Sequence, residues 1–146
     1  MHLRPLRGHS YVNTRSIALS APATSVLDDP HLAVLATVDP DGRPQSSVVF
    51  VKRDGDSVLI STVVGRRKTR NMVRDPRVSL LVANAHGRYV AIRGTVEITE
   101  DPTKQLLHDM YDRFMNGATP PPEPGAERVI VRVLPERVYL FPPAAS

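Results

Sequence analysis

The strongest constraint on the fold is a series of short apolar, β-branched segments, each separated from the next by residues that favour turns. The first segment is followed by Asp39-Pro40-Asp41-Gly42, in which proline presets φ and glycine accepts a positive φ. Such segments, bounded by such turns, are typical of strands that pair as antiparallel hairpins. Six strands are expected, at residues 31–38, 44–53, 57–63, 77–85, 89–99 and 128–141.

Local signals predict three short helices between these strands. The helix expected over 21–29 has Ser20 as its N-cap and Pro22 in its first turn. A second helix is expected over 66–75, and a third from about 102 to 115, where apolar residues recur at helical spacing. Because these helices are short, we expect them only to cover the ends of a β structure and to connect its strands.

The expected fold class is mainly β, a small six-stranded antiparallel barrel. Within it, Gly94 marks a bulge in the fifth strand, and Pro135 marks a bend in the last one. The proline-rich segment 116–125 is expected to be a loop. No composition shift divides the chain, so residues 1–20 are predicted to form an N-terminal arm and residues 21–146 one cofactor-binding domain.

Composition excludes several classes of protein. The chain contains no cysteine, which removes disulfides, thiolate metal sites and cysteine nucleophiles. It has no apolar run long enough for a membrane helix and no apolar signal core, so a cytoplasmic location is expected by default. The net charge of +4 favours anionic partners, and most of the cations are arginine, whose planar fork suits phosphate and carboxylate. A GC-rich genome produces the same arginine bias.

The densest chemical signal is the segment 61–71, Ser-Thr-Val-Val-Gly-Arg-Arg-Lys-Thr-Arg-Asn. Here a strand that carries two hydroxyls leads through a glycine into the start of a basic helix. Helix N-termini present free N–H groups and the positive end of the helix dipole, which favours an anion. Arg66, Lys68, Ser61 and Thr62 could therefore hold a phosphate. The alternative is a solvated basic helix face with no ligand.

Taken together, four motifs resemble one known family. They are Leu-Ala-Thr-Val-Asp-Pro-Asp-Gly-Arg-Pro-Gln at 35–45, the strand at 58–62, Arg-Arg-Lys-Thr-Arg-Asn at 66–71 and Asp-Pro-Arg-Val-Ser at 75–79. In order and spacing they resemble the pyridoxamine 5'-phosphate oxidase-like split β-barrel family, and more narrowly its branch of flavin- and deazaflavin (F420)-dependent oxidoreductases. The resemblance covers about residues 32–141.

This resemblance implies a homodimer with a cofactor in each cleft between subunits. Arg66 and Lys68 would bind the cofactor phosphate, and the pair Arg66-Arg67 suggests a long anionic tail such as that of coenzyme F420. The ring would lie against the strand ends, with the segment 84–88 reaching across from the partner subunit. The implied cofactor-binding residues are Val49, Phe50, Val51, Ser61, Thr62, Arg66, Arg67, Lys68, Asn84, His86, Arg88 and Arg137.

The chemistry that the resemblance implies is hydride transfer from reduced coenzyme F420 to a small conjugated or quinone-like acceptor. The cofactor carries out the difficult step in such reactions, which fits a chain without an evident catalytic triad. No catalytic residue is identified, and Tyr89, Tyr139 and His86 are the candidate proton donors. The five histidines show no spacing suited to a metal.

Two alternatives remain open. The same fold could hold FMN and act as an oxidase, a reductase or a flavin carrier, and the sequence separates FMN from F420 poorly because both use the phosphate site.

A nucleic-acid-binding barrel would use the basic helix together with aromatic stacking platforms. Aromatic residues make up only 5% of the chain and are scattered, which disfavours nucleic acid as a partner.

Overall fold

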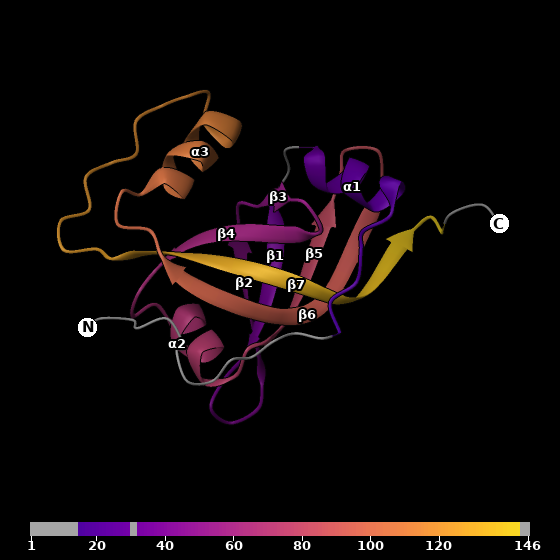
Figure 1. Ribbon diagram of the computed structural model, residues 1–146, viewed down its shortest axis with the longest axis horizontal. Helices are drawn as coiled ribbons and strands as arrows, with labels where there is room; N and C mark the ends of the chain where they lie inside the picture. The colour runs from indigo at the N-terminus through magenta and orange to yellow at the C-terminus, as the bar shows by residue number, and fades with distance from the viewer. Residues whose placement is uncertain (1–14, 30–31, 144–146) are drawn as a thin grey trace.

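A single curved antiparallel sheet forms the body of the molecule (Figure 1). The computed structural model describes residues 15–29 and 32–143, so most of the predicted N-terminal arm lies outside the described residues. Neighbouring strands in the sheet follow the order β2-β1-β5-β6-β7-β4-β3. The strands are β1 (Ala33–Val38), β2 (Pro44–Val49), β3 (Lys52–Asp54), β4 (Ser57–Val63), β5 (Arg77–Ala83), β6 (Tyr89–Glu100) and β7 (Arg128–Phe141).

The mainly β antiparallel fold is confirmed, whereas the predicted number of six strands is wrong. The expected strand at 44–53 is divided into β2 and β3, which gives a sheet of seven strands. β2 pairs with β1 at one edge of the sheet and β3 pairs with β4 at the other. Because only Phe50 and Val51 separate β2 from β3, the sheet must curl until its two edges approach each other.

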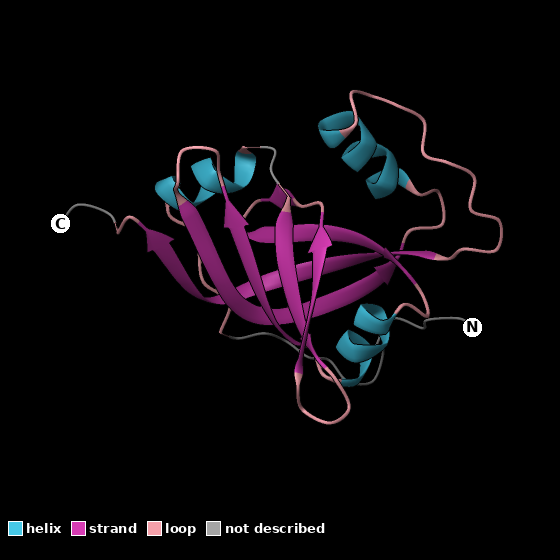
Figure 2. Ribbon diagram, turned by 180° about the vertical axis from the view of Figure 1, so that it is seen from behind, coloured by secondary structure: helices cyan, strands magenta, loops and turns pink. Residues whose placement is uncertain are grey.

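The core lies inside this curl. Alternate residues of the strands point inward, and Leu35, Ile60, Leu80 and Ile92 are completely buried there. Helix α1 (Ala21–Asp28) covers one end of the curled sheet and helix α2 (Arg67–Arg74) lies at the other (Figure 2). Helix α3 (Gln105–Phe114) stands outside the curl, where Leu106 and Met110 form a second cluster with Leu59.

The bulge predicted at Gly94 is confirmed. Gly94 pairs with Pro135 while the preceding residue, Arg93, pairs with Arg137, so Glu136 is the extra residue on β7. A Cβ atom at Gly94 would lie 2.1 Å from the carbonyl oxygen of Leu134. Only glycine therefore fits where the two long strands bend together.

Two of the three predicted helices begin at the expected places, but α3 begins later. Ser20 caps α1 as predicted, its hydroxyl accepting a hydrogen bond from the Ala23 N–H at 3.3 Å. Before α3, Lys104 adopts a left-handed conformation, and the Asp101 carboxylate accepts from the Leu106 N–H at 2.9 Å. The Asp101 carboxylate thus accepts hydrogen bonds that the first turn of the helix would otherwise lack, and the regular helix begins only at Gln105. None of the helices in the described residues is long and apolar enough to cross a membrane.

Candidate functional site

The predicted anion-binding segment forms the connection between β4 and α2. Gly65 has a φ of +92°, which lets the chain reverse between strand and helix. Thr62 is completely buried, and its hydroxyl lies 3.2 Å from that of Thr69, which in turn donates to the Val63 carbonyl at 2.8 Å. Thr62 therefore holds the first turn of α2 against the end of β4.

A buried carboxylate fixes the rest of α2. The Arg67 Nε and the Asn71 Nδ2 both donate to Asp39 Oδ1 at 2.9 Å, and Arg67 makes a second bond to the other oxygen. Asn71 also donates to the Thr37 hydroxyl at 3.0 Å. The hydrogen bonds from Arg67 and Asn71 hold the pKa of Asp39 below its usual range. Asp39, expected only as a turn residue, thus anchors α2 to the β1–β2 hairpin.

This anchoring divides the three consecutive cations of the segment into two groups. Arg67 points to Asp39, whereas Arg66 and Lys68 make no ion pair within the described part of the chain. Lys68 is half-buried, and burial together with the nearby charges of Arg66 and Arg128 lowers its pKa. A cation that is partly desolvated beside like charges is stabilised by an anion.

The N-terminus of α2 adds to the same positive region. Arg66 occupies the N-cap position but offers no side-chain hydrogen bond, and the first turn contains no acidic residue. The N–H groups of this turn are therefore without a side-chain acceptor in the described structure. Arg66, Lys68 and the start of α2 together form what we call the β4–α2 cationic site.

Arg128 is a neighbour of this site that the sequence reading missed. Its Nε and Nη2 both donate to the Glu123 carboxylate at 2.8 Å, and Lys104 lies 3.4 Å from the same group. Arg128, and then Lys104, hold the pKa of Glu123 at about 2. Arg128 reaches Lys68 because it is paired with Val63 across β7 and β4, a register that nothing in the local sequence shows.

On the strand that leads into the cationic site, the outer face of β4 carries an unsatisfied hydroxyl. The Ser61 Oγ is buried and has no hydrogen-bond partner. Phe50 lies over the neighbouring cluster and stacks on Phe114 of α3, with ring centroids 4.5 Å apart. The side chains of Val49 and Val51 belong to the core, so this segment can offer a ligand only its backbone and the Phe50 ring.

The other predicted site residues lie elsewhere in the chain. Asn84 closes the β5–β6 turn, its Oδ1 accepting from the N–H groups of His86 and Arg88 at 2.9 and 3.0 Å. This turn follows the end of β5 opposite to α2, and seven residues of strand measure roughly 20 Å or more. Asn84, His86 and Arg88 therefore cannot join Lys68 of the same chain around one phosphate.

Arg137 and the candidate proton donors Tyr89 and Tyr139 share the outer face of the sheet. Tyr89 stacks on Phe141 with ring centroids 5.1 Å apart, and both rings are exposed. His86 is exposed in the β5–β6 turn. The single chain thus places none of these three candidates beside the cationic site. Among the residues described here, no three acidic or histidine side chains are grouped so that they could hold a metal ion.

The outer face also carries an unusual row of apolar side chains. Pairing across five strands aligns the residues of this row, and all of them point away from the core. Sheets with one solvated face ordinarily place polar residues there, so this row is an exposed apolar patch on the outer face. The apolar row consists of Val48, Val34, Leu81, Ala91 and Tyr139.

A model of one known protein family matches most of the chain. Residues 20–141 match the family described as pyridoxamine 5'-phosphate oxidase. A pyridoxine/pyridoxamine 5'-phosphate oxidase of Blochmanniella pennsylvanica is 33% identical over 103 residues, which are 69% of this chain and 47% of that protein. The corresponding oxidase of Acidothermus cellulolyticus is 37% identical over 83 residues, 56% of this chain and 37% of the relative. The chain thus spans less than half the length of these curated relatives.

Solved structures match over a larger share of their length. A protein named F420 reductase is 34% identical and superposes with a TM-score of 0.76, covering 83% of this chain and 98% of that one. A conserved hypothetical protein of Mycobacterium tuberculosis is 25% identical with a TM-score of 0.69, covering 87% of this chain and 86% of the other. In both structures, most of the protein superposes on most of this chain, including its sheet.

Proposed function

Because the chain belongs to the pyridoxamine 5'-phosphate oxidase family, we propose that it is an oxidoreductase that uses reduced coenzyme F420. The cofactor is bound between two copies of the chain, and its hydride passes to a small conjugated or quinone-like acceptor. The alternative cofactor is FMN, held by the same residues.

The observation that carries this proposal is the β4–α2 cationic site with the unsatisfied Ser61 hydroxyl beside it. Lys68 is partly buried among cations, the start of α2 is uncapped, and Ser61 Oγ lacks a partner. A buried polar group without a partner costs roughly 1–3 kcal/mol, and a ligand that supplies the missing acceptor recovers that energy. A phosphate at this place would satisfy all three features, so the residues fit a phosphorylated cofactor.

The solved relatives support F420 as the cofactor. The protein named F420 reductase is 34% identical to this chain and is matched over 98% of its own length, whereas 47% and 37% of the two curated oxidases are matched. Neither comparison identifies the acceptor.

The roles of the residues follow from their positions. Arg66 and Lys68 hold the phosphate, and Asp39 keeps Arg67 and α2 in place so that Lys68 stays directed at it. The Ser61 hydroxyl donates to the same phosphate, the backbone of 49–51 lies along the ring, and the stacked pair of Phe50 and Phe114 excludes water beside it. The ring system supplies hydride chemistry when bound, while the protein supplies position and electrostatics.

A dimer explains the residues that lie far from the cationic site. The apolar row is a surface of the kind that a second subunit covers, and the β5–β6 turn borders the same face of the sheet. In such a dimer, Asn84, His86, Arg88 and Arg137 of one chain contact the cofactor held by Lys68 of the other. Tyr89, Tyr139 or His86 then supplies a proton from across the interface.

Replacing Leu81 by aspartate is expected to break the dimer and to remove cofactor binding with it. Leu81 lies at the centre of the apolar row and is 43% exposed in the single chain, so the substitution leaves the core intact. Burying an unpaired carboxylate in an interface costs several kcal/mol, which corresponds to at least about a hundredfold weaker association. Sedimentation of the variant should give 16.1 kDa, half the mass of the parent.

The matched control is Thr99→Asp, which adds the same charge at an exposed position of β6 outside the apolar row. It should remain dimeric and bind cofactor as the parent does. A monomeric parent protein that binds cofactor normally would contradict the dimer, although not the cationic site.

The function itself is tested by titrating the purified protein with coenzyme F420 and with FMN, followed by assays of reduced F420 with quinones. We expect quenching of F420 fluorescence at micromolar or lower concentrations, at least about tenfold tighter binding than FMN, and oxidation of the reduced cofactor only when protein and acceptor are both present. Tighter binding of FMN would establish the alternative cofactor. No binding of either compound would overturn the proposal.

A further inference from the structure

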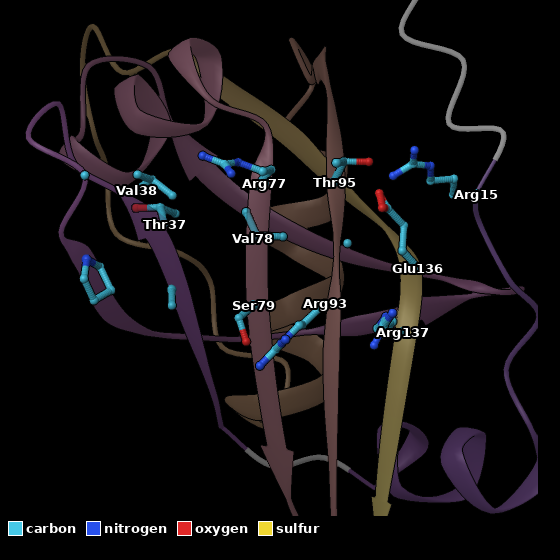
Figure 3. Close-up of a pocket in the computed structure, with 14 residues that line it drawn as sticks. Arg15, Thr37, Val38, Arg77, Val78, Ser79, Arg93, Thr95, Glu136 and Arg137 are labelled. Carbon is cyan, nitrogen blue, oxygen red and sulfur yellow. The ribbon is translucent and has the colours of Figure 1, made fainter.

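Two hollows in the surface differ in what they add to the proposed function. The hollow on the outer face of the sheet has a volume of about 760 Å³ and is lined by Arg93 and Arg137, among others (Figure 3). It belongs to the cofactor site proposed above, to which Arg137 is assigned. A smaller hollow of about 240 Å³ lies between the β4–α2 connection and the base of α3, where Val64, Lys104 and Arg128 line it. Its charged residues have no role in the function described so far.

These charges lie at the base of a long excursion of the chain. Residues 101–127 leave the sheet after β6, include α3, and return to the sheet at the start of β7. The two ends of this α3 excursion meet, because the Asp101 N–H donates to the Arg128 carbonyl at 3.0 Å. In Figure 1 the excursion projects from the body of the sheet. Its base is therefore a fixed point, next to the strand that leads into α2.

The α3 excursion is bonded directly to the β4–α2 connection. The Val64 N–H donates to the Glu127 carbonyl at 3.0 Å, and Arg128 follows at the start of β7, which pairs with β4. Burial, and then the charges of Arg66 and Arg128, lower the pKa of Lys68. Register and the backbone bond thus place Arg128 next to the cationic site. An anion held by Lys68 lies near a third cation that the sequence does not place there.

Glu123 is held in a defined position beside that third cation. The Ala126 N–H donates to the Glu123 carbonyl at 3.1 Å, and Gly125 has a φ of +78°. Proline at the second position and glycine with positive φ at the third are the signature of a type II turn, here with Pro124 second. The turn fixes the backbone at Glu123 and so limits where its carboxylate can reach.

The carboxylate of Glu123 occupies the fork of Arg128. The Arg128 Nε and Nη2 both donate to it at 2.8 Å, and Lys104 lies 3.4 Å away. The side chain of Arg128 is only 10% exposed and that of Glu123 is 21% exposed, so water screens this pair poorly. A bidentate pair of this kind is among the strongest hydrogen-bonded contacts in proteins. Arg128 is thereby neutralised, although it lies next to the cationic site.

The charge of a phosphate depends on how it is esterified. A phosphomonoester, such as the one in FMN, carries about −1.5 to −2 at pH 7 and has a second pKa near 6. The phosphate of coenzyme F420 is a diester, which carries a single negative charge. A dianion gains more energy than a monoanion from every cation added nearby. A site in which one adjacent cation is already neutralised therefore favours the diester.

We propose that Glu123 determines which phosphate the β4–α2 cationic site accepts. It is an internal counter-anion that keeps Arg128 from the ligand, so that the site binds a phosphodiester and disfavours the dianion of a phosphomonoester. Glu123 acts through Arg128 and does not touch the cofactor, which makes it a positioning residue. The inference rests on the proposed function, whose preference for F420 over FMN it explains.

Glu123→Gln tests the proposal, because glutamine keeps the length of the side chain and loses its charge. Fluorescence titration should show FMN binding at least about tenfold tighter than in the parent, since the freed Arg128 can bond to the phosphate, and F420 binding at most about threefold tighter. The gain for FMN should grow from about pH 5.5 to 8, as the monoester loses its second proton. F420 should show no such trend, because its diester does not titrate there.

Two matched variants separate this effect from a general change of charge or a loss of folding. Glu123→Gln combined with Arg128→Gln removes the freed cation and should bind FMN within about twofold of the parent. Asp112→Asn removes the same charge from an exposed position of the α3 excursion and should change neither dissociation constant. A gain for FMN that persists in the double variant, that appears in Asp112→Asn, or that is equal for both cofactors would overturn the proposal.

Inorganic phosphate provides a measurement that does not depend on the cofactor. At mildly alkaline pH it is mainly a dianion, and it should raise the melting temperature of Glu123→Gln more than that of the parent, relative to chloride at equal ionic strength. Equal shifts in the two proteins would contradict the role of Glu123. If neither cofactor binds but phosphate stabilises Glu123→Gln selectively, the proposed function is wrong and the control of anion charge by Glu123 is supported.

Discussion

Replacing Arg66 and Lys68 together by alanine is expected to weaken cofactor binding by roughly a hundredfold to a thousandfold or more, while the protein stays folded. Each side chain contributes charge-assisted hydrogen bonds worth about 1.5–3 kcal/mol to a phosphate in a partly desolvated site. Lys68→Ala alone should weaken cofactor binding by about tenfold to a hundredfold. The quantity to measure is the dissociation constant of coenzyme F420 and of FMN by fluorescence titration at fixed ionic strength.

The structure offers a control on the same helix. Arg70 is exposed on α2, only two residues beyond Lys68, so Arg70→Ala removes the same charge from the same element. It should leave the dissociation constant within about twofold of the parent, because a solvent-exposed charge contributes little. Stability should be unchanged in Lys68→Ala, since Lys68 forms no ion pair in the described structure. If the double variant binds both cofactors as the parent does, the assignment of the phosphate site is wrong.

Gly94→Ala is expected to be among the most destabilising single substitutions in this chain, with a loss of at least about 3 kcal/mol in the free energy of unfolding. The new Cβ would lie 2.1 Å from the Leu134 carbonyl oxygen and 2.9 Å from its carbon. Those are backbone atoms of β7, so the clash cannot be relieved by a side-chain rotation. Overpacking in a core costs about 1–3 kcal/mol, and here the two longest strands must also separate.

Urea unfolding followed by circular dichroism measures this loss. Thr99→Ala, an exposed substitution on the same strand, should change the free energy of unfolding by less than about 0.5 kcal/mol. Gly94→Ala should also move Arg93, because the bulge sets the position of that residue opposite Arg137. A variant that unfolds at the urea concentration of the parent would mean that the bulge relaxes without cost.

The basic segment 61–71 shows which features could be predicted from the sequence and which could not. The glycine, the helix and the cluster of cations at 61–71 were all readable from residue types, and the structure places them as a strand, a turn and a helix. Three adjacent cations look equivalent in a sequence. The structure makes Arg67 different, because Asp39 approaches it from a hairpin 28 residues away in the chain. Long-range pairing of this kind leaves no local signal.

The broken strand at 44–53 shows the same limit in the fold. The alternation of residues correctly indicated extended backbone, since β2 and β3 are both strands. Alternation does not tell which neighbour a strand pairs with. The change of partner at Phe50 and Val51 comes from the curling of the open sheet, which brings its two edges near each other and depends on all of its strands together.

By itself, the sequence determined the local features: that the chain is a series of strands and turns with short helices between them, that Ser20 caps the first helix, that Gly94 interrupts a strand, and that cations follow the β4 hydroxyls. These features depend on backbone preferences and periodicity within a few residues, and so they can be read along the chain. Only the tertiary structure decided that Arg67 is held by Asp39, that Arg128 stands beside Lys68, and that Arg93 faces Arg137. Each of these depends on strand register and on sheet curvature, which bring together residues far apart in the chain and make some charges neighbours without a counterion.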